Sequence, residues 1–338
     1  MKKYRAAVVG CGRIGCGFDD DPKRKQISTH ARAYMNCSRT DLVALCDIDE
    51  SKLTRYGAKL GVSSLYRDVE SMLSKEKPDI VSVCTPTSSH YEVVKIAVQH
   101  GVRAIYCEKP IADTLTKADE MVRLCDANGV VLMINHQRRF DPVHQAARQF
   151  LKNNEAGRIQ HAMFHYTAGI ANTGSHIVDL IRFLISEVEW VQGYHSVNSS
   201  QKPDDPNIDG IMKLSTSSFC SLNAYDVNDF LIFELDIIGT KCRLRLTHSG
   251  YGLDYYSVGD SHLFSGYKEL YKADTPINTD VSREPLLEAV NHTVDCIEGK
   301  AEPISSGMDG RKALELIEAL KMSAMQDGKR VYLPLGAS

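Results

Sequence analysis

The stretch Ala6-Ala-Val-Val-Gly10-Cys-Gly12-Arg-Ile-Gly15 decides the fold of this chain. Four apolar residues suited to a buried strand run directly into a G-x-G-x-x-G pattern, and a helical segment follows. Glycine patterns recur by chance, but one placed between a strand and a helix is what a dinucleotide-binding turn requires. The glycines permit a tight turn, close approach of a pyrophosphate and close packing of helix on strand. The first candidate cofactor-binding residues are therefore Gly10, Gly12, Arg13, Ile14 and Gly15.

Short apolar runs recur through the first 140 residues, separated by segments with helix start and stop signals. The runs are residues 42–46, 80–84, 104–107 and 130–134. Such runs suit strands buried on both faces, and their alternation with helices predicts a doubly wound parallel sheet of the α/β class. Within this region, Ser89-His-Tyr-Glu92 is a predicted capping box that opens a helix ending at Gly101.

The pattern changes after Asp141-Pro142 to longer segments of alternating polarity. These are residues 158–167, 188–197, 211–225, 230–238 and 242–247, with Gly239-Thr240 as a predicted hairpin turn. They predict a mostly antiparallel open sheet in an α+β domain, closed by helices near 285–298 and 309–326. We expect a dinucleotide-binding domain over 1–142 and a substrate-binding and oligomerisation domain over 143–338.

The composition is that of an ordinary globular protein, with 43% hydrophobic and 25% charged residues in a chain of 338. A net charge of -3 gives no general attraction to nucleic acid or anionic lipid, and no apolar stretch is long enough for a membrane span. The ten cysteines lack C-x-x-C spacing, which favours reduced thiols in a cytoplasmic protein. The twelve histidines show no metal-ligand spacing, so no metal site is expected.

More residues separate Gly15 from Asp47 than the usual glycine-to-acid distance of about 20. The excess lies in residues 16–29, an insertion rich in acidic and basic side chains. A solvated loop is the favoured interpretation of this insertion. A lid over the pyrophosphate is the alternative, because the segment leaves the glycine turn directly.

Asp47 ends the second predicted strand, where an acid bonds both hydroxyls of the adenosine ribose. A carboxylate at this position repels a 2′-phosphate, and Ile48-Asp-Glu50 supplies no arginine to neutralise one. The sequence therefore favours NAD over NADP. Capping of the following helix is the alternative role, although Asp49 or Ser51 would serve equally well.

Glu108-Lys109-Pro110 follows a later predicted strand, at the sheet edge where open parallel sheets bind ligands. Lys109 beside a substrate oxygen would donate a proton as an ammonium, or accept one as a neutral amine, while hydride moves at the adjacent carbon. Glu108 would bind the second ribose of the cofactor or hold Lys109 in place. Pro110 fixes the turn, and a proline here is compatible with a cis peptide bond. A solvated charge pair at a strand end is the alternative.

In the second half, residues 177–185 have the pattern of an amphipathic helix, with His176 in its first turn and Asn172 just before it. A histidine in a first helical turn can relay a proton, because its ordinary pKa lies near 6.5. The alternatives are that Asn172 caps the helix and that His176 is a surface side chain. Asp179, one turn later, would orient His176 or anchor the helix.

These residues, in this order, resemble the glucose–fructose oxidoreductase, inositol dehydrogenase and rhizopine-catabolism family, Gfo/Idh/MocA. Besides the glycine turn and Glu108-Lys-Pro110, the motifs that carry the resemblance are Cys84-Thr-Pro-Thr-Ser-Ser-His90, Arg139-Phe-Asp-Pro142, Gly174-Ser-His-Ile-Val-Asp179 and Glu284-Pro-Leu-Leu-Glu-Ala-Val-Asn-His292.

The resemblance implies a Rossmann domain followed by a sheet domain whose open face builds dimers or tetramers. It implies oxidation or reduction of one carbinol carbon in a sugar, cyclitol or sugar nucleotide. By position, Thr85, Pro86, His90 and Glu108 would line the cofactor, and Lys109 and His176 would be catalytic. A sheet face left uncovered by the C-terminal helices also favours a homodimer or homotetramer.

Asn172 departs from the family pattern, because many members have an aspartate there. Asparagine cannot accept a proton, so either Lys109 and His176 suffice or Asn172 only orients a substrate hydroxyl. A non-catalytic NAD- or sugar-binding regulator is the alternative function. The candidate substrate-binding residues are Lys109, Arg139, Tyr166, Asn172 and His176, with the polar stretch 196–207. Nothing in the sequence distinguishes a sugar from a sugar nucleotide or an inositol.

Overall fold

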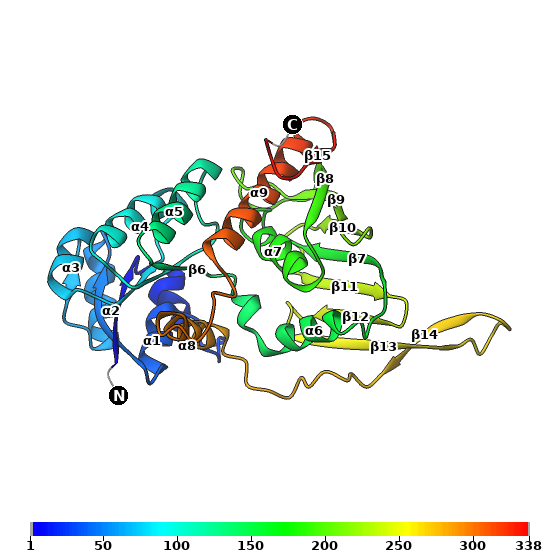
Figure 1. The fold of residues 1–338 in the computed structure, drawn as a ribbon, viewed down its shortest axis with the longest axis horizontal. Helices are drawn as coiled ribbons and strands as arrows, with labels where there is room; N and C mark the ends of the chain where they lie inside the picture. Colours follow the sequence, from blue (N-terminus) through cyan, green and yellow to red (C-terminus); the bar gives the residue numbers. More distant parts are fainter. Residues whose placement is uncertain (1–2, 337–338) are drawn as a thin grey trace. The chain divides into compact units, whose positions relative to one another are not determined.

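The computed structural model describes residues 3–336, which divide into two compact units (Figure 1). The first unit contains the residues up to Asp141 together with Arg283–Lys312, and the second contains Pro142–Ser282 together with the residues from Ala313 onward. The segment 283–312 thus differs from the expected division at residue 142. It joins the first unit because its apolar side chains complete that unit's core.

Among the described residues, the first unit has one sheet of six parallel strands in the order β3-β2-β1-β4-β5-β6. The strands are β1 (Tyr4–Val9), β2 (Thr40–Cys46), β3 (Leu65–Tyr66), β4 (Ile80–Val83), β5 (Ala104–Cys107) and β6 (Val131–Ile134). This is the doubly wound Rossmann order, and it confirms the predicted fold class. The strand order reverses between β1 and β4, where such sheets bind their ligands.

Helices cover both faces of this sheet. They are α1 (His30–Asn36), α2 (Glu50–Leu60), α3 (Val69–Glu76), α4 (His90–Gln99), α5 (Leu115–Ala127) and α8 (Pro285–Ile297). One apolar cluster joins α1, α2 and α8 through Tyr34, Leu53 and Val290. Burial of this face, worth about 1.5–3 kcal/mol per large side chain, is what draws α8 back to the first unit.

The helix starts follow the sequence signals in part. Asp49 caps α2 by accepting a hydrogen bond of 3.0 Å from the N–H of Ser51. The predicted capping box at Ser89 is wrong, because α4 follows a short 3-10 turn (Thr87–Ser89) and the Ser89 hydroxyl donates to the carbonyl of Pro86 at 2.8 Å.

The glycine turn leads into a π-helical turn (Arg13–Gly17) and a 3-10 turn (Phe18–Asp20). The insertion, which begins within these turns, is tied to α1 and α2 by two acids. Asp19 accepts from Nη1 of Arg32 in α1 at 3.2 Å, and Asp20 accepts from the hydroxyl of Tyr56 in α2 at 2.9 Å. Residues 21–25 between these ties are exposed, as the favoured solvated-loop interpretation expects.

The second unit is built on a mixed sheet of nine strands within the described residues, in the order β14-β13-β12-β11-β7-β10-β9-β8-β15. The strands are β7 (Ile159–Tyr166), β8 (Val188–His195), β9 (Ile208–Leu214), β10 (Phe219–Ala224), β11 (Phe233–Gly239), β12 (Cys242–Thr247), β13 (Gly252–Asp260), β14 (Lys268–Ala273) and β15 (Val331–Tyr332). Neighbouring strands are antiparallel except β7 and β10, which are parallel. The predicted mostly antiparallel sheet is therefore confirmed.

Two features of this sheet differ from expectation. The segment 211–225, expected as a single stretch, forms two strands because Ser217 takes a positive φ of 70° in the turn between them. The pair β13–β14, which the sequence analysis did not predict, extends as a long hairpin beyond the neighbouring strands of this sheet (Figure 1, yellow). The hairpin turn at Gly239-Thr240 joins the antiparallel pair β11–β12, as predicted.

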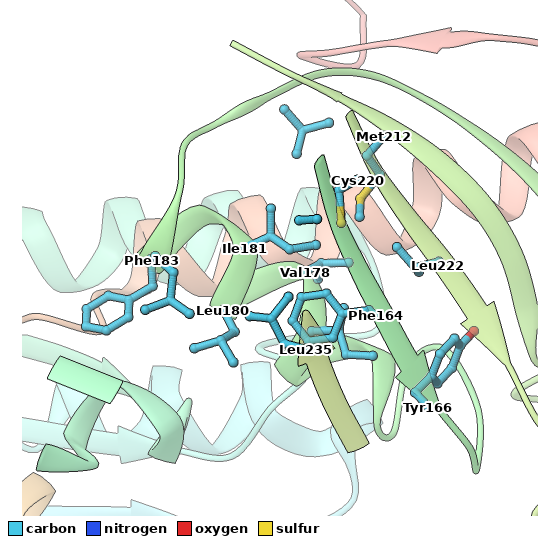
Figure 2. Close-up of a cluster of buried hydrophobic side chains, with 14 of the residues drawn as sticks. Phe164, Tyr166, Val178, Leu180, Ile181, Phe183, Met212, Cys220, Leu222 and Leu235 are labelled. Carbon is cyan, nitrogen blue, oxygen red and sulfur yellow. The ribbon is translucent and has the colours of Figure 1, made fainter. Parts of the chain in front are cut away.

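The apolar face of this sheet is covered by α6 (Pro142–Lys152), α7 (Gly174–Leu184) and the part of α9 (Gly307–Ala324) that belongs to the second unit. Figure 2 shows Val178 and Ile181 of α7 beside Phe164 of β7. The apolar face is thus covered within the chain, so the argument for oligomers from an uncovered apolar face does not hold.

No helix between residues 3 and 336 has the length and apolarity needed to cross a membrane. All ten cysteines of the sequence fall in this range and are buried thiols.

Candidate active site

A cavity of about 600 Å³ lies at the carboxyl ends of β1, β2 and β4. Its lining includes the predicted cofactor residues Gly10, Gly12, Asp47, Thr85 and Pro86. The fold thus brings together residues from three separate strand ends, at the point where the strand order reverses. Open α/β sheets bind nucleotides at this point.

The glycine turn is shaped for close packing on one side and open space on the other. Gly10 has a φ of 97°, and a Cβ there would lie 2.6 Å from the main chain of Cys84. A Cβ on Gly15 would lie 1.9 Å from the carbonyl oxygen of Gly10. Gly12 lines the cavity, and a Cβ there would meet nothing within 4 Å. The backbone at Gly12 is therefore accessible to a phosphate group, and these residues fit a dinucleotide.

Asp47 is fixed by two backbone donors. Its Oδ2 accepts from the N–H of Cys11 at 2.7 Å, and its Oδ1 accepts from the N–H of Asp49 at 2.9 Å. The cavity lining also contains Lys52 and Arg67. Residues 48–50 contain no arginine, but the fold brings Arg67 from just beyond β3 to this cavity, a contact that the sequence near Asp47 does not reveal.

His90 was expected to line the cofactor, but its contacts are those of a structural brace. The ring is buried, with Nε2 2.9 Å from the carbonyl oxygen of Thr85 and Nδ1 3.1 Å from that of Pro110. His90 therefore ties the loop after β4 to the loop after β5. In the glycine turn, the Arg13 guanidinium lies 4.7 Å from the centre of the Phe18 ring, and Ile14 packs on the core of the first unit.

Glu108 and Lys109 follow the end of β5, and the Lys109–Pro110 bond is cis. Glu108 is buried, and its Oε1 accepts from Nε2 of His30 at 3.0 Å and from Nδ2 of Asn135. Burial acts to raise the pKa of Glu108. The bonds from His30 and Asn135 and the charges of His30 and Lys109 outweigh burial and hold the pKa below its ordinary value. The carboxylate is therefore ionised at neutral pH, beside a partly exposed lysine.

Sequence reasoning missed His30 and Asn135, the two donors to Glu108. The available signal was the position of polar residues in apolar surroundings. Asn135 directly follows the apolar strand β6, and His30 opens α1 just after the insertion.

In the second unit, Asn172 lies in the loop before α7 and is tied down by Asp205. The Asp205 carboxylate accepts from the N–H of Ala171 at 2.7 Å and from the N–H of Asn172 at 2.9 Å. The Asn172 side chain donates to the carbonyl of Ala168 at 3.2 Å. Asp205 belongs to the polar stretch 196–207, so part of that stretch positions the Asn172 loop. The sequence analysis did not single out this aspartate.

His176 lies in the first turn of α7, as predicted, and is partly exposed. Its ring meets the Phe233 ring edge-on, with 6.4 Å between centroids. Asp179 is buried and lies 4.0 Å from the guanidinium of Arg182.

Two candidate substrate residues have structural roles instead. Tyr166 is fully buried, and its hydroxyl both donates to the carbonyl of Ile208 and accepts from its N–H, each at 2.8 Å. Arg139 is buried in the first unit, where it donates to the carbonyl of Ile304 at 2.7 Å and pairs with Asp309 at 3.1 Å. Both polar groups are engaged inside the protein, so neither is available to a substrate.

Comparison with known proteins gives the same family as the sequence motifs. A model described as "Oxidoreductase family, NAD-binding Rossmann fold" matches residues 4–136, and one described as "Oxidoreductase family, C-terminal alpha/beta domain" matches residues 165–333. D-apiose dehydrogenase of Paraburkholderia graminis is 30% identical over 98% of this chain and 90% of its own length. The myo-inositol 2-dehydrogenase of Thermotoga maritima is 29% identical over 46% of this chain and 42% of its own length.

Solved structures share the fold over the whole chain. The WlbA dehydrogenase of Bordetella pertussis, solved with NADH and UDP-GlcNAcA, has a TM-score of 0.79 at 23% identity and covers 99% of this chain and all of its own. An oxidoreductase of Agrobacterium radiobacter, solved with NAD+, L-tartaric acid and magnesium, has a TM-score of 0.78 at 21% identity and covers 98% of each chain. With family models matching both parts of the sequence, the chain belongs to the Gfo/Idh/MocA family of NAD-binding oxidoreductases.

Proposed function

We propose that this protein is an NAD(H)-dependent dehydrogenase acting on a secondary alcohol or ketone of a carbohydrate. The observation that carries the proposal is the joint placement of the nucleotide cavity and Lys109 at the carboxyl edge of one sheet. A hydride acceptor and a proton-transfer group at one edge are the two components that alcohol oxidation needs.

Each residue has a role in this reaction. Gly12 leaves room for the pyrophosphate, Asp47 binds the adenosine ribose, and Thr85 and Pro86 flank the cofactor. Bound NAD supplies the hydride acceptor at C4 of the nicotinamide. Lys109 takes the hydroxyl proton as the carbinol carbon becomes a carbonyl, and returns it in the reverse direction.

The second unit would contribute the groups that orient the substrate. Asn172, held by Asp205, would donate to or accept from a substrate hydroxyl. His176 would share the proton with Lys109. An amide at 172 cannot exchange a proton, so this reaction assigns Asn172 to orientation alone.

NAD is the proposed cofactor, because Asp47 is fixed with a negative charge in the cavity. Lys52 and Arg67 line the same cavity, so the electrostatic penalty against a 2′-phosphate is smaller than Asp47 alone would impose. We therefore propose a preference for NAD(H) with measurable use of NADP(H).

A small free sugar is the proposed substrate class. The two D-apiose dehydrogenases, from P. graminis and Rhizobium rhizogenes, resemble this chain at 30% and 25% identity over 98% and 96% of its length. D-apiose is therefore the first compound to test, followed by pentoses, glucosides, inositols and UDP-linked sugars.

The test is turnover measured as NADH absorbance at 340 nm across this panel, with purified full-length protein. We expect oxidation of at least one compound with NAD. Tight NADH binding without turnover of any compound would instead favour the non-catalytic regulator, for which the amide at Asn172 is the motivating observation.

We also propose that the protein forms a homodimer or homotetramer through the β13–β14 hairpin. Its loop carries Leu263, Phe264 and Tyr267, which are 76%, 63% and 70% exposed. Large apolar side chains gathered at the end of a projecting hairpin are typical of a surface that packs on another subunit.

A further inference from the structure

Hydrogen-bonded polar side chains form a continuous chain inside the first unit, behind the proposed active site. They come from four elements, α1, β4, β5 and the end of β6, and are Tyr34, His30, Ser82, Glu108, Tyr106 and Asn135. Each is buried. A satisfied polar network in an apolar core fixes the geometry of its members more strictly than apolar packing does.

The centre of this chain is His30. Its Nε2 lies 3.0 Å from Oε1 of Glu108, and its Nδ1 lies 2.8 Å from the hydroxyl oxygen of Ser82. The Ser82 hydroxyl lies 2.8 Å from that of Tyr34. Both ring nitrogens of His30 are therefore engaged within the protein.

The donor to Glu108 is the same in both charge states of His30. An ionised Glu108 only accepts, so Nε2 of His30 carries the proton between them. When Nδ1 carries no proton, it accepts from Ser82, and Ser82 accepts from Tyr34. When Nδ1 is protonated as well, it donates to Ser82, and Ser82 donates to Tyr34.

On the far side of Glu108, Asn135 donates to the same Oε1 that His30 contacts. The hydroxyl of Tyr106 in turn donates to Oδ1 of Asn135 at 2.6 Å, which sets the amide orientation. With Oε1 held by two donors, Oε2 is the oxygen of Glu108 that stays available to other groups.

We propose that His30 is a positioning residue that holds Glu108 ionised and fixed through Oε1, leaving Oε2 to bind the Lys109 ammonium and the nicotinamide ribose. This inference rests on the proposed dehydrogenase function. The inference adds His30 of α1 to the residues that serve this function, although His30 touches neither Lys109 nor the nucleotide cavity in the described contacts.

The charges around Glu108 give the direction of the pH effect. The charged groups that act on Glu108 are His30 and Lys109, and both lower its pKa. Three other titratable side chains lie near Glu108, namely Cys84, Cys107 and Tyr106. Burial has the larger effect on them and the negative charge of Glu108 the smaller one. Both raise their pKa values, so they stay neutral. Loss of the His30 donor would raise the pKa of Glu108, and the ionised form would then be lost at a higher pH.

A packing role alone makes a different prediction. The His30 ring lies 4.6 Å from the Tyr106 ring, so its removal would also disturb the core. His30→Gln keeps an amide donor toward Glu108, whereas His30→Leu keeps the volume without a donor. If only packing matters, Leu serves as well as Gln, and neither moves a pH profile.

The experiment measures kcat/KM and the Kd for NADH between pH 4.5 and 9 for the unchanged protein and both variants. We expect His30→Leu to move the acidic limb upward by about one to two pH units, as loss of a hydrogen bond to a charged group implies. His30→Gln should restore most of the position of that limb. His292→Gln is the control, because His292 is a half-buried histidine of the first unit, bonded to the carbonyl of Glu302 and not to Glu108.

A uniform loss of activity at every pH in His30→Leu, with an unmoved limb, would overturn the proposal. Failure of the proposed function is distinguishable, because the pKa of Glu108 can be followed by NMR in protein labelled with ¹³C at the glutamate carboxyl, without turnover. An unchanged Glu108 titration in His30→Leu refutes the positioning role even in an inactive protein. If His30→Leu does not fold, His30→Met takes its place, because methionine also fills the site without a donor to Glu108, and it must shift the same titration in the same direction.

Discussion

The carboxylate of Asp47 accepts a 2.7 Å hydrogen bond from the backbone N–H of Cys11, the residue between the first two glycines of the turn. The residue proposed to bind the ribose and the turn proposed to bind the pyrophosphate are thus directly linked. Asp47→Ala should weaken NADH binding by about 10- to 100-fold, the loss expected for hydrogen bonds from a charged group. NADPH binding should change less, so the difference in affinity between NADH and NADPH should become smaller.

Fluorescence titration with both reduced cofactors measures this preference. Arg67→Ala is the companion variant, expected to weaken NADPH more than NADH because Arg67 lines the same cavity. Equal or tighter binding of NADPH by the unchanged protein would contradict the assignment of NAD.

Gly12 and Gly15 allow binding to be separated from folding. Gly12 has a φ of -73° and open space beyond its Cα, so Gly12→Val should change the free energy of unfolding by no more than about 0.5 kcal/mol. The added side chain would enter the cavity and weaken NADH binding at least about tenfold. Gly15→Ala should instead destabilise the fold, because its Cβ would meet the carbonyl of Gly10.

Thermal unfolding of the two variants measures the change in stability, and titration with NADH measures the change in affinity. Undiminished NADH affinity in Gly12→Val would show that the cofactor does not approach the turn at this residue.

Lys109→Met should lower kcat by roughly 10²–10⁴-fold, the usual contribution of one general acid or base. The Kd for NADH should change much less, since Lys109 is assigned to the substrate hydroxyl. Steady-state kinetics with the best substrate provide the measurement, and Lys117→Met, at a partly exposed lysine of α5, is the control. Substantial activity in Lys109→Met would leave His176 as the remaining proton-transfer group.

Asn172→Asp tests the departure from the family pattern. The backbone N–H of residue 172 is bonded to Asp205, so a second carboxylate at 172 would lie close to an existing one. Their repulsion should raise the pKa of one of the two acids, and the pH profile of kcat should gain a new limb. If Asn172 only orients a hydroxyl, turnover persists and substrate preference changes. Loss of all turnover in Asn172→Asp would contradict that role.

Replacement of the loop residues 262–267 by a short Asn-Gly turn should lower the molar mass in light scattering. The exposed Phe264 and Tyr267 would be lost, whereas the core of the sheet would remain. A monomeric unchanged protein at micromolar concentration would refute the oligomer.

The parallel sheet was predictable because each of its strands is a short apolar run buried on both faces, so composition alone marks it. The hairpin β13–β14 was not predictable in this way. Its residues are half-exposed on both faces, so Gly252–Asp260 shows no alternation of polarity. The packing of α8 on the first unit could not be predicted from the sequence either, because an amphipathic pattern does not specify which sheet the helix covers.

Site prediction followed a similar division. Five predicted cofactor residues belong to local motifs, and the structure places them together in one cavity. They are Gly10, Gly12, Asp47, Thr85 and Pro86. Roles set by long-range contacts were not found. His30 meets Glu108 across 78 positions of sequence, and Arg139 meets Ile304 across 165.

The return of residues 283–312 to the first unit bears on how the protein is made. During synthesis the ribosome completes the Rossmann sheet early, but Leu286 and Val290 of α8, which belong to its core, emerge only after the whole of the second unit's large sheet segment. Until then an apolar face of the nascent first unit lacks its covering helix and stays exposed to water and to chaperones. The two units therefore finish folding together near the end of translation, and a chain cut after residue 142 is an incomplete Rossmann unit.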